Sequence, residues 1–206
     1  MGCIVSSMRH VLLEKGRLEA FSDGVLAVII TIMVLELRLP RGSDFASLAP
    51  AVPTFAAYVL SFVNIGIYWN NHHHMFQAIK GYDGRSMWAN LHLLFWLSLI
   101  PLMTAWIGEN PRASIPTAVY GSVLLCAGFA YSLLQMSLIA ANGEDSALAR
   151  ATGHRDFKGR ASLVLYAIAI PVAFIMPLIS DAIYVAVAVM WFVPDRRVER
   201  ALVTEK

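Results

Sequence analysis

Two long stretches without any formal charge constrain this chain more than any other feature. Residues 48–79 contain no Asp, Glu, Lys or Arg, and neither do residues 113–143. A helix needs about 20 mostly apolar residues to cross the hydrocarbon core of a bilayer. Inside that core, only helices and closed barrels satisfy their own backbone hydrogen bonds. Uncharged runs of this length therefore indicate membrane-spanning helices.

The composition agrees with a membrane protein. Hydrophobic residues make up 58% of the 206 residues and charged residues 15%, against about 25% charged in soluble domains. We interpret six apolar segments as spans, of which the last is short: 18–39, 50–79, 86–108, 114–141, 160–178 and 180–194. We predict an all-α integral membrane protein with one six-helix transmembrane domain over residues 1–206, without a soluble domain or an internal repeat.

The basic residues are distributed unevenly between the two sides of such a bundle. If the N-terminus lies in the cytoplasm, three of the 16 Lys and Arg residues fall outside the cell, and these are Arg38, Arg41 and Arg112. Loops on the cytoplasmic side carry an excess of Lys and Arg. We therefore predict a multi-pass protein whose N- and C-termini are both cytoplasmic.

Polar residues fall at one depth in the first three predicted helices. Ser22 and Asp23 lie about one and a half turns from the cytoplasmic start of the first helix, and Asn90 and His92 lie about as far into the third. The histidines at 72–74 lie at a similar depth in the second. A carboxylate at membrane depth costs several kcal/mol unless it is paired or hydrated. We predict an interhelical hydrogen-bond cluster of Ser22, Asp23, one or two of these histidines, and Asn90 or His92.

The histidine run does not predict a metal site. Successive helical residues point about 100° apart, so His72, His73 and His74 cannot share one face. A zinc pair on one helix is typically spaced i, i+4. A role in joining helices is the simpler interpretation, and no metal is expected.

The first helix also carries an apolar stripe. Gly24, Val28, Thr31 and Leu35 recur at three- and four-residue steps, and Ile32 flanks them. In a bundle of several copies this stripe could line a central axis, with a ring of hydroxyls at Thr31. Any buried helix carries such a stripe, however, and the pattern alone favours packing over a pore.

The start of the first helix resembles a family signature. The pattern Arg17-x-x-x-Phe21-Ser22-Asp23 is similar to that of the transmembrane protein 175 family, which comprises potassium channels of endo-lysosomes and of many prokaryotes. Three further segments resemble parts of that family. Residues 68–76 are similar to its second helix, residues 90–101 to its third helix and residues 194–197 to its C-terminal ending.

The resemblance implies a homotetramer in which the first helix lines a central pore. It implies a hydrophobic constriction and a nearby hydroxyl that helps to hold the ion, in place of a Thr-Val-Gly-Tyr-Gly filter. The pore positions that it implies here are Val28, Thr31, Ile32 and Leu35. It also implies a network that ties the first three helices together, for which we expect Arg17, Phe21, Ser22, Asp23, His73, His74, Asn90 and His92. Val28 is smaller than the isoleucine or leucine expected there, which predicts a wider inner constriction.

With this resemblance, we predict a channel that prefers potassium over other monovalent cations in the plasma membrane of a prokaryote, surrounded by lipid. No cofactor and no nucleic-acid partner are expected, and an enzyme is the least expected class. Two alternatives stay open. Asp23 and the histidines of the second and third helices could relay protons in a proton channel or a proton-coupled carrier. The protein could also be a scaffold that transports nothing.

Overall fold

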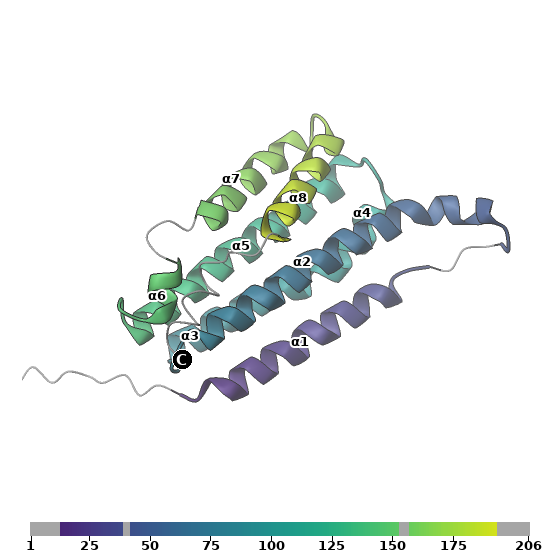
Figure 1. Cartoon of the computed structure of the whole chain (residues 1–206). Coiled ribbons are helices and arrows are strands. Elements are labelled where there is room, and N and C mark those ends of the chain that lie inside the picture. Colours follow the sequence, from purple (N-terminus) through teal and green to yellow (C-terminus); the bar gives the residue numbers. More distant parts are fainter. Residues whose placement is uncertain (1–12, 39–41, 153–156, 193–206) are drawn as a thin grey trace, which may run out of the picture.

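The fold was obtained as a computed structural model, which describes residues 13–38, 42–152 and 157–192. In these ranges the chain is almost entirely helical, apart from one isolated β-bridge between Leu13 and Tyr82. Figure 1 shows the helices, which are α1 (Lys15–Leu35), η1 (Phe45–Ala51), α2 (Val52–Gln77), α3 (Gly84–Ser98), α4 (Ile100–Glu109), α5 (Ser114–Asn142), α6 (Ala147–Thr152), α7 (Phe157–Val172) and α8 (Pro177–Phe192). The predicted C-terminal motif at 194–197 lies outside the described residues.

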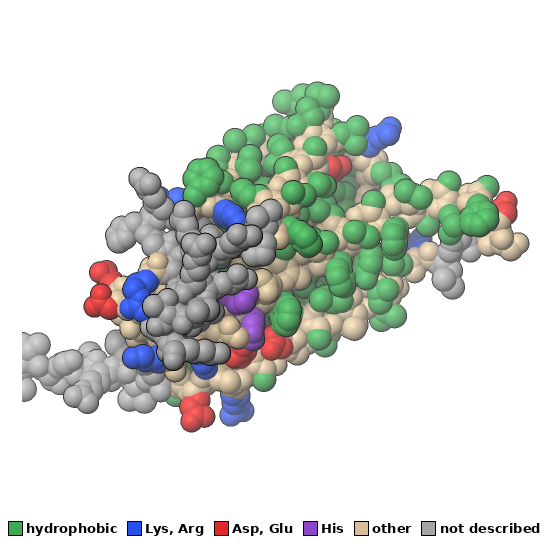
Figure 2. Space-filling view, in the orientation of Figure 1, with side chains coloured by type: hydrophobic (Ala, Val, Ile, Leu, Met, Phe, Trp, Pro, Cys, Tyr) green, Lys and Arg blue, Asp and Glu red, His purple; other side chains and the backbone are tan. Residues whose placement is uncertain are grey.

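Four helical stretches within the described residues are long and apolar enough to cross a membrane. They are α1, η1 with α2, α3 with α4, and α5, whereas α8 is a shorter apolar helix. On the face shown in Figure 2, hydrophobic side chains are concentrated over the middle and one end of the bundle, and charged side chains gather mainly at the other end. The chain is thus an all-α membrane protein, as its sequence predicts.

The third predicted span consists of two helices. The helix α3 ends at Ser98, and α4 begins at Ile100 with Pro101 in its first turn. Proline has no N–H and its ring clashes with the preceding turn, so it kinks or breaks a helix. Leu99 N–H instead donates to the oxygen of Trp96 in a tighter turn. Both η1 and α6 are additional elements that the hydropathy pattern does not predict.

The helix α5 forms the centre of the bundle, where it packs mainly against α3 and α7. The helix α1 lies at the opposite edge from α7 and contacts α2, α3 and α4 (Figure 1). Ile65 of α2, Leu97 of α3 and Leu124 of α5 are almost completely buried in this core. Since α1 has neighbours among the described helices on one side alone, this part of the chain leaves one of its faces uncovered.

A lysine joins the beginning of α1 to the end of α2. The Lys15 Nζ atom donates to the carbonyl oxygens of Phe76 at 2.8 Å and Ile79 at 2.9 Å, and to that of Gln77 at 3.3 Å. The last carbonyls of a helix lack partners within the helix, and a cation there is favoured by the helix dipole. This contact fixes where α1 enters the bundle.

One glycine allows α4 to approach α2 closely. A Cβ atom on Gly108 would lie 2.7 Å from the backbone Cα of Thr54. Real Cβ atoms do not come this close, and backbone cannot turn aside as a flexible side chain can. On α2 itself, a Cβ on Gly66 would have no such atom within 4 Å.

Gly108→Ala is therefore predicted to lower the thermal stability of the purified protein, because the two helices must separate. Gly66→Ala is the matched control, since both substitutions replace a helical glycine by a better helix former, worth about 1 kcal/mol in favour of alanine. We expect Gly66→Ala to leave the unfolding temperature in detergent unchanged or raise it. Equal behaviour of the two variants would contradict the close α2–α4 contact.

Candidate functional site

The two faces of α1 have opposite surroundings. Its buried side chains are spaced three or four residues apart and face α2, α3 and α4; they are Leu18, Ser22, Leu26, Ile29 and Met33. The four residues predicted to line a pore lie on the other face. Val28 is 55% exposed, Ile32 42% and Leu35 81%, and Thr31 is exposed as well. No helix within residues 13–38, 42–152 and 157–192 covers this stripe.

An open groove runs beside the stripe. Gly24, Val28 and Ile32 form its α1 side, and Pro101 and Leu102 of α4 contribute to the other side. The break between α3 and α4 thus lies next to the exposed face of α1. The sequence alone does not predict this groove.

The Thr31 hydroxyl has a defined orientation. It donates its proton to the carbonyl oxygen of Val28 at 2.8 Å, one turn back along α1. A hydroxyl oxygen has two lone pairs that can accept hydrogen bonds or bind cations. Because its proton is directed to the backbone, the oxygen presents its lone pairs to whatever lies along the exposed face.

A buried chain of hydrogen bonds links α1, α3 and α2. The Ser22 Oγ atom donates to the carbonyl oxygen of Leu18 at 2.9 Å and accepts from Asn90 Nδ2 at 2.8 Å. The Asn90 Oδ1 atom lies 2.8 Å from His72 Nε2, which must be the donor because an amide oxygen only accepts. Ser22, Asn90 and His72 are all 1% exposed or less. Three helices are therefore held together by three side chains away from water.

A second set of contacts joins α1 to α2 on a more accessible side. His73 Nδ1 lies 2.9 Å from Glu19 Oε1, and His73 Nε2 lies 2.7 Å from Gln77 Nε2. Asp23 Oδ1 accepts from Trp69 Nε1 at 2.9 Å, and the rings of Trp69 and His73 are stacked. The acids and their partners each follow an i, i+4 spacing along their own helix. That spacing is visible in the sequence. From it, Glu19, Trp69 and Gln77 could have been predicted to take part in the contacts between α1 and α2.

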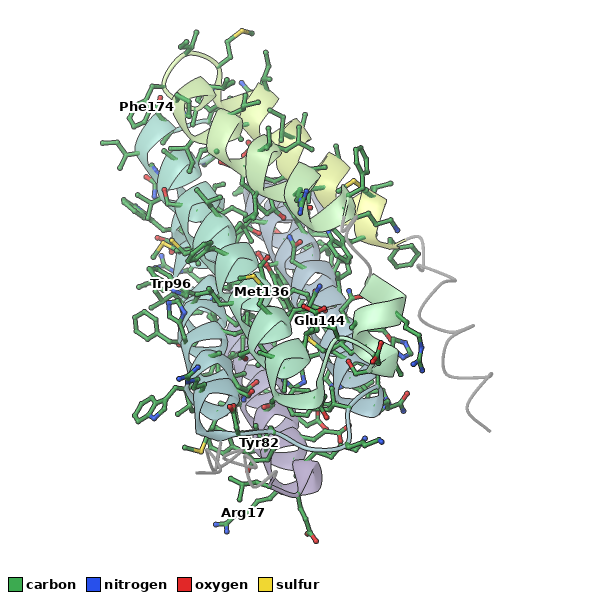
Figure 3. The ribbon with its side chains drawn as sticks, turned by 90° about the vertical axis from the view of Figure 1, so that its left-hand side faces the viewer. Arg17, Tyr82, Trp96, Met136, Glu144 and Phe174 are labelled. Carbon is green, nitrogen blue, oxygen red and sulfur yellow. The ribbon has the colours of Figure 1, made fainter. Side chains whose placement is uncertain are left out.

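The remaining predicted network residues lie apart from the buried chain. His92 accepts from Trp96 Nε1 within α3, at 2.9 Å, whereas the hydrogen bonds of Ser22 are made with Leu18 and Asn90. The His74 Nδ1 atom is buried and has no partner in the described part of the protein. Arg17 is exposed and points away from the bundle (Figure 3), and Phe21 is 52% exposed. The structure therefore brings Ser22 and Asn90 together with His72, which lies one residue before the histidines named for the network.

The opposite end of α1 is joined to α4 by an ion pair. Arg38 Nη2 lies 2.7 Å from Glu109 Oε1, and both side chains are largely exposed. Exposed pairs of this kind contribute about 0–1 kcal/mol. Across the described residues, no three His, Cys, Asp or Glu side chains are placed to hold a metal ion.

Comparison with known proteins matches the part of the chain that holds these contacts. The model of a family described as the endosomal/lysosomal potassium channel TMEM175 matches residues 17–101, which include Ser22, His72 and Asn90. A crystal structure of a lysosomal potassium-selective channel TMEM175 homolog from Chamaesiphon minutus has the same fold. Its TM-score is 0.73 at 27% identity, and the match covers 88% of this chain and 97% of that one.

Curated relatives extend the match over nearly the whole chain. A bovine protein named endosomal/lysosomal proton channel TMEM175 is 28% identical over 182 residues, which are 80% of this chain and 38% of that one. A potassium channel of Streptomyces collinus is 39% identical over 129 residues, 59% of this chain and 63% of that one. A potassium channel of Chryseobacterium sp. is 52% identical over 190 residues, 92% of this chain and 98% of that one. The chain therefore belongs to the TMEM175 family of ion channels.

Proposed function

We propose that this chain is one subunit of a potassium-preferring channel that four copies form around their α1 helices. The observation that carries the proposal is the division of α1 into two faces. One face holds Ser22 and is buried, whereas the other exposes Val28, Thr31 and Leu35. In sequence this chain resembles potassium channels of Chryseobacterium and Streptomyces, and this resemblance supports potassium as the ion.

The chemistry of the exposed face fits passage of a partly dehydrated cation. Rings of Val28 and Leu35 would narrow the axis and remove part of the ion's water. The outward lone pairs of four Thr31 hydroxyls would replace some of that water. Potassium loses water more easily than sodium, so it would pass more readily. Val28 is a small side chain, which makes Leu35 the narrower ring in this proposal.

In the proposed channel each subunit crosses the membrane six times as a single domain, with α7 and α8 as the fifth and sixth spans. Each of these helices has 16 residues, or about 24 Å at 1.5 Å per residue. This is shorter than the roughly 30 Å hydrocarbon core, and local thinning of the bilayer absorbs such a mismatch. Both termini would lie in the cytoplasm of a prokaryotic cell, and the channel in its plasma membrane.

A proton channel is the second candidate. The pair of His73 and Glu19 at 2.9 Å combines a histidine and a carboxylate that are both partly accessible, with Asp23 one turn further along α1. Histidine titrates near neutral pH, which suits proton transfer. The bovine relative named a proton channel supports this alternative. In this case current would follow the proton gradient and would depend on His73 rather than on Thr31.

One prediction of this proposal concerns the exposed face. Leu35→Ala is expected to raise cation flux into liposomes and to lower the potassium-to-sodium ratio, because a wider ring leaves more water on the ion. Thr31→Ala is expected to lower the same ratio by about fivefold, which corresponds to about 1 kcal/mol in relative barrier height. Potassium and sodium flux from purified protein is the measurement.

Leu178→Ala serves as the matched control, since Leu178 of α8 is exposed in the single chain and lies outside the proposed pore. This variant should conduct like the unmodified protein. If neither Leu35→Ala nor Thr31→Ala changes rate or selectivity, the assigned pore face is wrong.

The second prediction concerns the buried chain of hydrogen bonds. Asn90→Leu leaves Ser22 and His72 without their partner, and an unsatisfied buried group costs about 1–3 kcal/mol. We expect a lower unfolding temperature and loss of selective flux, because α1 is no longer fixed. Asn70→Leu, the same substitution at an exposed position of α2, is the control. Unfolding temperatures that do not differ between the two variants would count against a positioning role for Asn90.

A further inference from the structure

The two halves of α1 lie beside different helices. In the first half, Ser22 is hydrogen-bonded to Asn90 of α3, 68 residues further along the chain. Just beyond the second half, Arg38 is paired with Glu109 of α4. Because the two pairs have nearly the same separation in sequence, α1 runs parallel to α3 and then to α4, both of which it contacts. The half of α1 that ends at Leu35 therefore lies along α4.

The hydrogen bonds that fix α1 to α3 do not fix α4. The helix α3 ends at Ser98, and α4 begins at Ile100 with Pro101 in its first turn. Since proline interrupts the backbone hydrogen bonds of a helix, the two helices can change their relative angle here. The ion pair at the end of α4 is largely exposed and adds little. The position of α4 must therefore depend on its buried contacts.

A second chain of buried hydrogen bonds supplies such contacts. Thr104 Oγ1 of α4 lies 2.6 Å from Ser61 Oγ of α2, which lies 3.0 Å from the hydroxyl of Tyr120 in α5. The Thr104 hydroxyl is also 2.7 Å from the carbonyl oxygen of Ile100, one turn back along α4. Thr104 is 4% exposed, Tyr120 2% and Ser61 0%. Hydrogen bonds of this kind join helices in a membrane, and Thr104 thus links α4 to both α2 and α5.

Thr104 lies level with the proposed pore. Counted with the 68-residue separation found between α1 and α3, it falls beside the end of α1 at Leu35. Leu102, two residues before it, lines the groove beside the exposed face of α1 together with Ile32. A shift of α4 would therefore change the support of α1 and one wall of this groove at once.

We propose that Thr104 is a positioning residue for ion selectivity in the channel. Through Ser61 and Tyr120 its hydroxyl holds α4, and α4 holds the second half of α1, so that Thr31 and Leu35 keep their orientation. Thr104 itself is buried and does not touch the ion. This inference rests on the proposed function, and it adds a residue of another helix to those that determine selectivity.

The test compares potassium and sodium flux into liposomes for variants of the full-length protein. Thr104→Val keeps the shape of the side chain and removes the hydroxyl. We expect it to lower the potassium-to-sodium ratio by about threefold, the factor that corresponds to one interhelical hydrogen bond in a membrane. Thr104→Ser keeps the hydroxyl and should retain the ratio. Thr117→Val is the matched control, because Thr117 is buried as well but its hydroxyl has no partner within the described residues.

A double variant separates positioning from general stability. If Thr104 acts through the ring at Leu35, adding Thr104→Val to Leu35→Ala should change the ratio no further. Ser61→Ala removes the partner on α2 and should lower the ratio in the same direction as Thr104→Val. Combining Ser61→Ala with Thr104→Val should again produce less than the sum of the two effects, because both break one link.

The outcomes are distinct. A lower unfolding temperature of Thr104→Val with an unchanged ratio would show a merely structural role and would overturn the inference. An equal loss of selectivity in Thr117→Val would overturn it too. If Thr104→Val does not fold, Ser61→Ala decides in the same way. If the unmodified protein shows no preference for potassium, the proposed function itself fails, and this inference fails with it.

Discussion

The requirement that polar groups find partners away from water determines how α1 sits in this protein. Ser22 reaches Asn90, and Asn90 reaches His72, so one face of α1 must be turned to α2 and α3. A helix turns about 100° per residue, which places Thr31, nine residues after Ser22, about 180° away. The same buried contact that stabilises the subunit therefore turns the predicted pore stripe outward, where it can meet other copies of the chain.

The two candidate functions depend on different atoms at this helix. In the proposed potassium channel, selective passage would depend on the exposed face, where Thr31 presents oxygen lone pairs between apolar side chains. Passage of protons would depend on Glu19 and Asp23 near the beginning of α1 and on His73 of α2, where the contacts between the two helices are partly accessible. Membership of the TMEM175 family is compatible with both, since its relatives include proteins named potassium channels and proteins named proton channels.

Much of the fold follows from the sequence, because uncharged apolar runs of about 20 residues or more are typical of membrane-spanning helices. Counting residues from the helix ends also predicts that Ser22 and Asn90 lie at one level. The choice among His72, His73 and His74 could not be made in this way, because adjacent residues point about 100° apart and the rotation of α2 about its axis is set by packing. The groove beside α1 could not be predicted from the sequence either, since it depends on the break between α3 and α4.

The central claim is that identical copies turn the exposed face of α1 to a shared axis. An electron cryomicroscopy map of the assembled protein in a lipid bilayer tests it most directly. The account predicts four subunits with Val28, Thr31 and Leu35 pointing at that axis, and the Ser22 side of each helix turned to its own subunit. A map in which these three side chains face lipid, or lie within a lone subunit, would contradict it.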